Sequence, residues 1–213
     1  MSNAVVVESV NVGTPQEAVW NRQTFTTAII KRPVRGRVRM AGVNAEGDDQ
    51  ADRTVHGGPD KAIYAYGTLD YEWWHEEHGV DPMPGLFGEN LTLSGIDLGA
   101  CLIGERWRVG SALLEVSEPR IPCYKLAYRM NDPHFVKLFG KALRPGSYFR
   151  IVEEGEVGAG DRAELAYRPG EHELTVRETM RIYLFAKDER QKFTGVSALG
   201  EDWRSWAAQA PPG

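Results

Sequence analysis

The stretch that decides the fold class is Arg106-Trp107-Arg108-Val109-Gly110-Ser111-Ala112-Leu113-Leu114-Glu115-Val116-Ser117. Its two halves are rich in residues that favour extended backbone, and the glycine between them is a turn signal. Similar short runs recur along the chain, separated by glycine, proline or acidic turns: Ala4–Val10, Thr27–Lys31, Arg37–Met40, Ala62–Tyr66, Asn90–Leu93, Tyr148–Glu153 and Ala163–Tyr167. Many short strands at close spacing predict a mainly β barrel or sandwich rather than alternating βαβ units.

Two helices are expected to interrupt the strands. The first is Leu69–His78, which Gly79 is placed to end. The second is Pro133–Phe139, where Asp132 can cap the amino end and Gly140 follows the last residue. Aspartate at a cap, proline at the first helical position and glycine after the last are typical of helix boundaries.

The pattern turns helical after Arg168-Pro169-Gly170. Thr175-Val176-Arg177-Glu178 reads as a capping box that starts a helix continuing through Phe185. Shorter helices are expected over Asp188–Phe193 and Leu199–Ala208. Three short helices bury too little to fold alone, so they should dock on the barrel or on a partner. We therefore expect a β-barrel domain over residues 1–168 and a helical extension over residues 169–213.

Composition excludes several classes of protein. The 213 residues carry 25 Lys and Arg against 30 Asp and Glu, with 42% apolar residues, which is ordinary for a globular protein and not for a disordered or collagen-like chain. No apolar run is long enough to span a bilayer, and Met1–Glu8 lacks the features of a signal peptide. We expect a cytoplasmic protein without a membrane partner. The net charge of −5 argues against a nucleic-acid partner.

The two cysteines differ in their surroundings. Cys101 lies in the apolar stretch Leu98–Ile103 and is expected to be a packing residue. Cys123 lies in Glu118-Pro119-Arg120-Ile121-Pro122-Cys123-Tyr124-Lys125, where the prolines end a strand and predict a stiff loop. Arg120 and Lys125 favour the thiolate, which attacks electrophiles and binds metals. A structural and a reactive role for Cys123 both stay open at this point.

Two segments suggest an anion site. In Thr54-Val55-His56-Gly57-Gly58-Pro59-Asp60-Lys61, the glycines allow backbone amides to approach a phosphate, although a tight turn with a surface histidine explains the pattern equally simply. The segment Lys31–Arg39 holds five cations without an acid, and extended backbone puts Arg35, Arg37 and Arg39 on one side. That row is either a solvated face or the wall of an anion-attracting cleft.

Two further segments have ordinary structural explanations. The acidic stretch Glu46–Asp52 lacks calcium-loop spacing and reads as a solvated turn, with hydrogen bonds to a ligand's amino groups as the alternative. Glu89 and Asn90 follow a glycine turn at the entry to a strand. Turn capping explains that pair, and a place near the mouth of a pocket is the alternative.

Taken in order, four motifs resemble the MOSC-domain family, specifically its YiiM-like branch. They are Glu46-Gly47-Asp48-x-Gln50-x-Asp52, Val55-His56-Gly57-Gly58-Pro59-Asp60-Lys61-Ala62, Phe87-Gly88-Glu89-Asn90-Leu91 and Pro119-Arg120-x-Pro122-Cys123-Tyr124-Lys125-Leu126. The resemblance runs from about Ala28 to Tyr167, and the helical segment that follows resembles the three-helix extension of that branch.

The resemblance implies a closed β-barrel of the pyruvate-kinase-barrel type and a molybdenum cofactor, or molybdopterin, in which Cys123 supplies a protein thiolate to the metal. It implies an oxidoreductase that reduces N-hydroxylated compounds such as hydroxylaminopurines with electrons from a partner reductase. Pyridoxal phosphate binding and a homodimer are further family-level options. The alternative is a non-catalytic sulfur or cofactor carrier that uses Cys123.

The expected site combines these motifs. Cys123 is the metal ligand, and His56 is the expected proton donor because an imidazole titrates near neutral pH. The anionic cofactor gives cations a reason to converge, and thiolate is the soft ligand that molybdenum requires. The expected cofactor-binding residues are Lys31, Arg37, Arg39, Gly57, Gly58, Asn90, Arg120 and Lys125.

Overall fold

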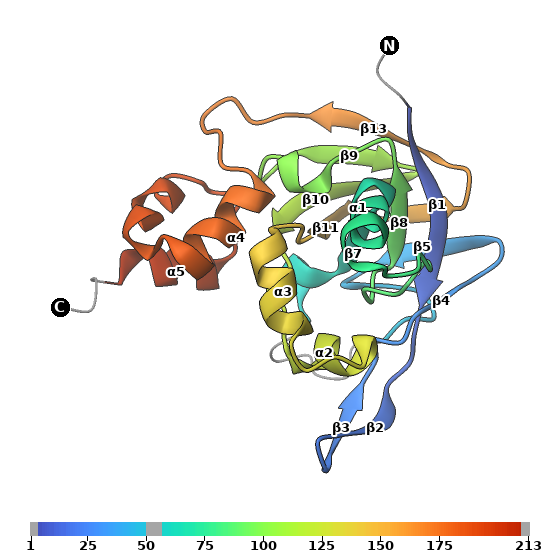
Figure 1. Ribbon diagram of the computed structural model, residues 1–213. Coiled ribbons are helices and arrows are strands. Elements are labelled where there is room, and N and C mark those ends of the chain that lie inside the picture. The colour runs from blue at the N-terminus through green and yellow to red at the C-terminus, as the bar shows by residue number, and fades with distance from the viewer. Residues whose placement is uncertain (1–3, 50–56, 210–213) are drawn as a thin grey trace.

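Seven strands close into a barrel in a computed structural model that describes residues 4–49 and 57–209 (Figure 1). The order around the barrel is β13-β9-β10-β11-β7-β8-β1, and the pairing of Val5 with Ala163 joins β1 to β13 and closes it. Neighbouring strands are antiparallel except β7 and β8, which are parallel. The closed mainly β barrel is therefore confirmed. The strands are β1 (Val5–Val12), β7 (Ile63–Gly67), β8 (Leu91–Ser94), β9 (Arg106–Val109), β10 (Ala112–Glu118), β11 (Ser147–Glu153) and β13 (Arg162–Tyr167).

The hairpin of β9 and β10 forms where the sequence predicts it. Val109 pairs with Ala112 across the turn, and Gly110 has a φ of 56°. A Cβ at Gly110 would lie 2.4 Å from the Glu156 carbonyl oxygen. Only glycine combines a positive φ with that close approach, so the turn depends on this residue.

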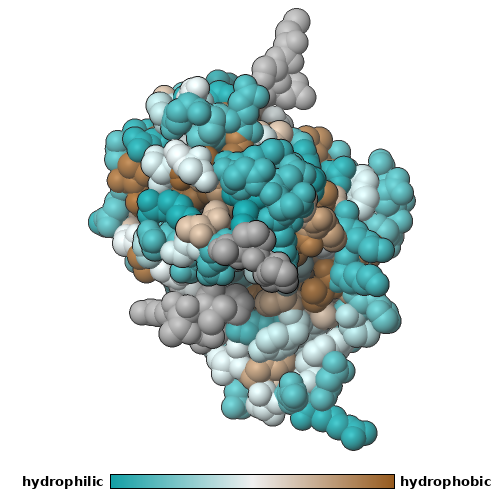
Figure 2. Space-filling view, turned by 90° about the vertical axis from the view of Figure 1, so that its left-hand side faces the viewer, coloured by the Kyte–Doolittle hydropathy of each residue, from teal (hydrophilic) through white to brown (hydrophobic). Residues whose placement is uncertain are grey.

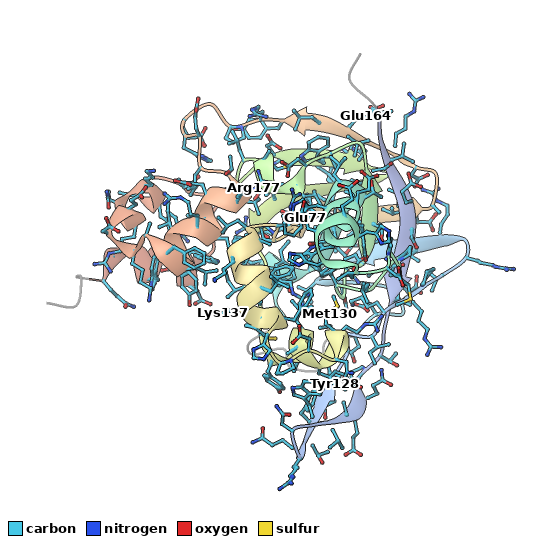
Figure 3. All side chains as sticks on the ribbon, in the orientation of Figure 1. Glu77, Tyr128, Met130, Lys137, Glu164 and Arg177 are labelled. Carbon is cyan, nitrogen blue, oxygen red and sulfur yellow. The ribbon has the colours of Figure 1, made fainter. Side chains whose placement is uncertain are left out.

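The remaining strands lie outside the closed barrel. β4 (Arg32–Pro33) pairs with β1, while β5 (Arg37–Ala41), β6 (Asn44–Ala45) and β12 (Gly155–Gly158) form a small sheet. β2 (Gln16–Trp20) and β3 (Gln23–Thr27) form a hairpin that projects from the molecule (Figure 1). Its base packs on the helix that carries Tyr128, whose ring lies 5.3 Å from the ring of Phe25 (Figure 3).

Helices and 3₁₀ turns cover one part of the barrel, where a buried aromatic cluster also includes side chains of β7. They are α1 (Thr68–His78), α2 (Tyr124–Met130), α3 (Phe135–Ala142) and the 3₁₀ turns η1 (Pro59–Lys61) and η2 (Leu98–Ala100). Trp74 of α1 is fully buried, and its Nε1 donates a hydrogen bond of 2.6 Å to the hydroxyl of Tyr66. Gly79 ends α1 in the left-handed conformation, as expected.

The structure departs from the local predictions at three places. Helix α2 was not predicted; it begins directly after Cys123, at the end of the loop expected there. Gly140 does not follow α3 but lies inside it, facing Leu184, and Leu143 provides the left-handed cap instead. The expected strand Thr27–Lys31 ends at Thr27, because the following residues turn inward and bury Lys31. In each case tertiary packing outweighs the local signal.

The carboxy-terminal helices dock on the barrel. They are α4 (Val176–Phe185), η3 (Lys187–Phe193) and α5 (Glu201–Ala208), and they lie to one side of the barrel (Figure 1). Thr175 caps α4 by accepting a hydrogen bond of 3.1 Å from the Glu178 amide, which is the threonine half of the predicted capping box. The Glu178 carboxylate instead accepts hydrogen bonds from Arg181 and Lys192. Arg177 at the start of α4 donates a hydrogen bond of 2.8 Å to Asp97 on the barrel side (Figure 3). Phe193 and Trp203 belong to the same buried cluster as barrel residues.

The outer surface of the helical extension carries both hydrophilic and hydrophobic side chains. Figure 2, which faces the helical extension, shows a largely hydrophilic surface with separate hydrophobic patches. Within residues 4–49 and 57–209, no helix combines the length and the apolar character that a membrane span requires.

Candidate functional site

One pocket gathers most of the side chains that the motifs single out. It contains about 590 Å³ of empty space, its open mouth included. Four basic residues line it, namely Lys31, Lys61, Arg120 and Lys125, together with Cys123. We call it the cationic pocket. Its walls come from the segment after β3, the turn after β6, η1 and the loop after β10.

Lys31 is held at the pocket wall by a buried ion pair. Its side chain is 7% exposed and bonds Asp48, whose side chain is 2% exposed. Asp48 also accepts hydrogen bonds of 2.7 Å from the Gly13 amide and 2.9 Å from Asn90 Nδ2. Burial lowers the pKa of Lys31 below its ordinary value, and Asp48 partly offsets that effect. Lys31, Asp48 and Asn90 therefore form one fixed polar unit.

Arg120 is anchored on a second side of the pocket. Its Nη1 donates to the Phe87 carbonyl, and its guanidinium carbon lies 5.0 Å from the centre of the Tyr64 ring. Burial disfavours its charge, but Tyr64, Tyr148 and Cys123 more than compensate, so the pKa of Arg120 is raised. A Cβ on neighbouring Gly88 would lie 3.4 Å from Nη1 and 2.9 Å from Ile29. Gly88 also has a φ of 77°, so a side chain at this position would strain the backbone and crowd Ile29.

Cys123 lies at the junction of the loop and α2. It is half-buried, occupies the N-cap position of α2 and lines the cationic pocket. Its thiol raises the pKa of Arg120 and, together with burial, that of Tyr148, so it belongs to the same electrostatic group. The stiff loop expected before Cys123 is present over residues 119–123.

Cys101 behaves differently. It is 4% exposed, lies in the main hydrophobic core, and burial raises the pKa of its thiol well above the ordinary value. A thiol of that kind is inert. The interpretation of Cys101 as a packing residue is confirmed, and neither cysteine is in a disulfide.

The other predicted site residues divide between the pocket and the surface. Lys125 and Asn90 line the pocket with Lys31 and Arg120. Arg37 and Arg39 lie on β5 with side chains 46% and 60% exposed, paired with Asp161 and Glu154, and they do not line the pocket.

Of the glycine-rich segment Thr54–Lys61, only residues 57–61 lie within the described part of the chain. Gly57 and Gly58 lead into η1, and Gly58 has a φ of 93°. His56 lies outside the described residues, so its role as the proton donor stays a prediction.

Sequence reasoning missed two kinds of site residue. The interpretation of Glu46–Asp52 as a solvated turn is wrong for Asp48, which is buried against Lys31. Tyr64 and Tyr148 line the pocket from β7 and β11, yet nothing in their strands distinguishes them from core residues. The signal for Asp48 was its place in the first family motif.

The family match accords with this arrangement. The MOSC domain matches residues 52–164, more than half of the chain. The chain belongs to the MOSC-domain family. This MOSC-domain protein is 38% identical over 202 residues to the uncharacterized protein YflK of Bacillus subtilis, covering 93% of this chain and 91% of YflK. It is 32% identical over 183 residues to protein YiiM of Escherichia coli, covering 83% and 81%.

Two more comparisons concern the branch of the family and a relative with a named activity. The crystal structure of YiiM from Geobacillus stearothermophilus superposes with a TM-score of 0.77 at 30% identity, covering 95% of this chain and 97% of that one. The YiiM matches identify the YiiM-like branch. A protein named reductase from Gibberella moniliformis is 34% identical over 149 residues, which are 68% of this chain but only 26% of the reductase.

The lining of the cationic pocket fits the cofactor associated with the MOSC domain. A ligand with a phosphate would meet the buried Lys31 and Arg120, and a soft metal would meet the Cys123 sulfur. Among residues 4–49 and 57–209, no group of three or more His, Cys, Asp and Glu side chains is arranged to hold a metal ion.

Proposed function

We propose that this MOSC-domain protein is a molybdenum-cofactor-dependent reductase of N-hydroxylated compounds. The observation that carries the proposal is the convergence of the Cys123 thiol with buried Lys31 and Arg120 on one pocket. The fungal relative named reductase supports an oxidoreductase, although this chain spans about a quarter of it. The electrons would come from a separate reductase partner.

The net reaction sets what the site must supply. An N-hydroxylated compound, R–NH–OH, takes up two electrons and two protons, its N–O bond breaks, and R–NH₂ and water leave. A bound molybdenum cofactor would supply the two-electron redox chemistry. The protein must bind the cofactor, orient the substrate and deliver protons.

The chain's own residues divide these tasks. Arg120 would neutralise negative charge on the cofactor, and Lys31, whose charge Asp48 already balances, would donate a hydrogen bond to it. Both side chains are fixed before binding, because the Phe87 carbonyl and Asp48 hold them. Cys123 would provide the soft ligand from a loop that prolines stiffen. Asn90 holds Asp48 and hence Lys31. His56 is our proposed proton donor.

The two cysteines offer a matched test. Protein made in a host with an intact cofactor pathway is assayed with 6-hydroxylaminopurine and a chemically reduced dye as electron donor. Cys123→Ala should abolish reduction, whereas Cys101→Ala should retain it because Cys101 only packs in the core. Reduction that survives Cys123→Ala would reject the proposal. A persulfide on Cys123 that transfers to an acceptor, without reduction of substrate, would favour the carrier alternative.

A further inference from the structure

A buried carboxyl group, that of Glu118, lies in a second pocket between the barrel and the helical extension. Glu118 ends β10 and is only 5% exposed. The extension contributes Tyr183 of α4 and Asp202, Trp203 and Trp206 of α5 to the same pocket. Burying a carboxyl group is costly, and the proposed reaction has so far assigned no task to this one.

The second pocket and the cationic pocket meet at the same side chains. Cys123, Lys61 and Tyr148 line both of them. Glu118 therefore belongs to the pocket that also presents the Cys123 thiol. A compound bound beside that thiol lies next to the wall that contains the Glu118 carboxyl group.

The contacts of Glu118 hold its carboxyl group in place. Trp203 Nε1 donates a hydrogen bond of 3.1 Å to Oε2, and Lys61 Nζ lies 3.5 Å from Oε1. Burial raises the pKa of Glu118 above its ordinary value, although Lys61 and Trp203 oppose that effect. Burial thus favours the neutral acid, whereas the two donors stabilise the carboxylate that remains after a proton has left. A group with both properties can hold a proton and release it.

The other titratable groups around Glu118 come from three elements. Asp60 and Lys61 belong to η1, Tyr148 to β11 and Asp202 to α5. The charge of Asp60 adds to the raised pKa of Glu118. Asp202 is exposed, and burial raises the pKa of the Tyr148 hydroxyl above that of an already weak acid. Among residues 4–49 and 57–209, Glu118 is therefore the buried carboxyl group that lines the second pocket.

The stoichiometry of the proposed reaction requires two protons. An acid that holds one proton can give only one before it is reloaded, and His56 would supply one. We propose that Glu118 is the second proton donor. Its carboxyl O–H bond breaks and the proton goes to the leaving oxygen, which departs as water, while His56 protonates the nitrogen. The two electrons come from the partner reductase, and solvent returns a proton to Glu118. This inference rests on the proposed reduction of N-hydroxylated compounds.

Glu118→Gln tests the role of the proton. Glutamine keeps the size of the side chain and an oxygen that can accept from Trp203, but it has no acidic proton. With holoenzyme, 6-hydroxylaminopurine and a chemically reduced dye, kcat should fall about a hundred-fold, with little change in KM or in molybdenum content. A wild-type kcat in Glu118→Gln overturns the proposal.

The same strand offers a matched control. Glu115 lies on β10, pairs with Arg106 and Arg150, and lines neither pocket. Glu115→Gln should therefore keep the wild-type kcat. A loss of kcat in Glu115→Gln as large as that in Glu118→Gln would mean that any carboxyl group lost from β10 disturbs the site, and it would overturn the specific role of Glu118.

An infrared titration examines Glu118 without turnover. The difference spectrum between wild-type and Glu118→Gln protein isolates the C=O band of the neutral Glu118 acid. That band should persist above about pH 4.3, the ordinary pKa of glutamate. A Glu118 that ionises at or below the ordinary pKa overturns the proposal, because an ionised carboxylate has no proton to give. Wild-type protein that never reduces the purine rejects the proposed function, whereas a fully active Glu118→Gln rejects the role of Glu118 alone.

Discussion

The cationic pocket and strand β5 both contain cations from one basic segment of the sequence, but these cations are buried in the pocket and exposed on the strand. Lys31, Arg37 and Arg39 belong to one basic segment. Lys31 is buried, paired with Asp48 and lines the pocket. Arg37 and Arg39 are exposed on β5 and paired with acids near or beyond the ends of β12.

The difference shows what separates a site from a charged surface. An exposed pair in water gains little and is screened by salt. A buried cation loses its hydration, so it must have fixed partners, and it then acts strongly on any anion beside it. Lys31 has such partners in Asp48 and, through Asp48, Asn90. The number of cations in the sequence segment did not distinguish a candidate site from a charged surface. The burial of each cation and its fixed polar partners do.

Removing Lys31 should have the largest effect. Lys31→Met leaves the buried Asp48 carboxylate without its cation, which should lower the free energy of unfolding by about 3 kcal/mol in urea titrations. Molybdenum content should fall as well. The double change Lys31→Met with Asp48→Asn should recover stability but not molybdenum. Recovery of both would mean that Lys31 has only a structural role.

Arg120→Lys should have the next largest effect. Lysine keeps the charge but lacks the planar guanidinium that bonds the Phe87 carbonyl through Nη1 while it lies over the Tyr64 ring. We expect cofactor retention through gel filtration to fall about ten-fold. Arg39→Lys, the same change on β5, is the control. Equal cofactor content in the two variants would contradict the assignment of Arg120.

Acid should loosen the helical extension. Arg181 and Lys192 hold the pKa of Glu178 at about 2, below its ordinary value. Because the folded-state pKa is lowered, the stabilisation is complete above the ordinary pKa and is lost as pH falls toward 2. Glu178→Gln should therefore lower the melting temperature by about 2 °C at neutral pH, with screening allowed for. The two melting curves should converge near pH 2, and a gap that widens there would be inconsistent with this account.

The smallest effect is expected on β5. Arg37→Gln with Arg39→Gln removes the ion pairs of Arg37 with Asp161 and Glu156 and that of Arg39 with Glu154. Melting temperature should change little in moderate salt, since exposed pairs are screened. Molybdenum content should equal that of the wild type. A loss of molybdenum comparable to that of Lys31→Met would erase the distinction between the two regions.

The sequence predicted the barrel because alternation and turn residues act locally. The β9–β10 hairpin and the Thr175 cap formed where expected. The sequence also distinguished Cys123 from Cys101 through flanking cations and prolines. It did not predict the short helix α2, which begins at Tyr124, because a helix of that length depends on packing for its stability.

The cations that line the cationic pocket were harder to predict. Strand period puts Arg37 and Arg39 on one side but does not say what that side faces. The partner that buries Lys31 is Asp48, 17 residues away, so only tertiary structure reveals the pair. The pocket between the barrel and the helical extension is similarly non-local, because its lining includes both Trp206 of α5 and Cys123.

The most direct test of the central claim is the molybdenum content of the protein purified from a host with an intact cofactor pathway. Wild-type protein should contain about one molybdenum per chain together with pterin, and Cys123→Ala should contain far less because it lacks the soft ligand. Wild-type protein that is free of molybdenum and pterin would contradict the account.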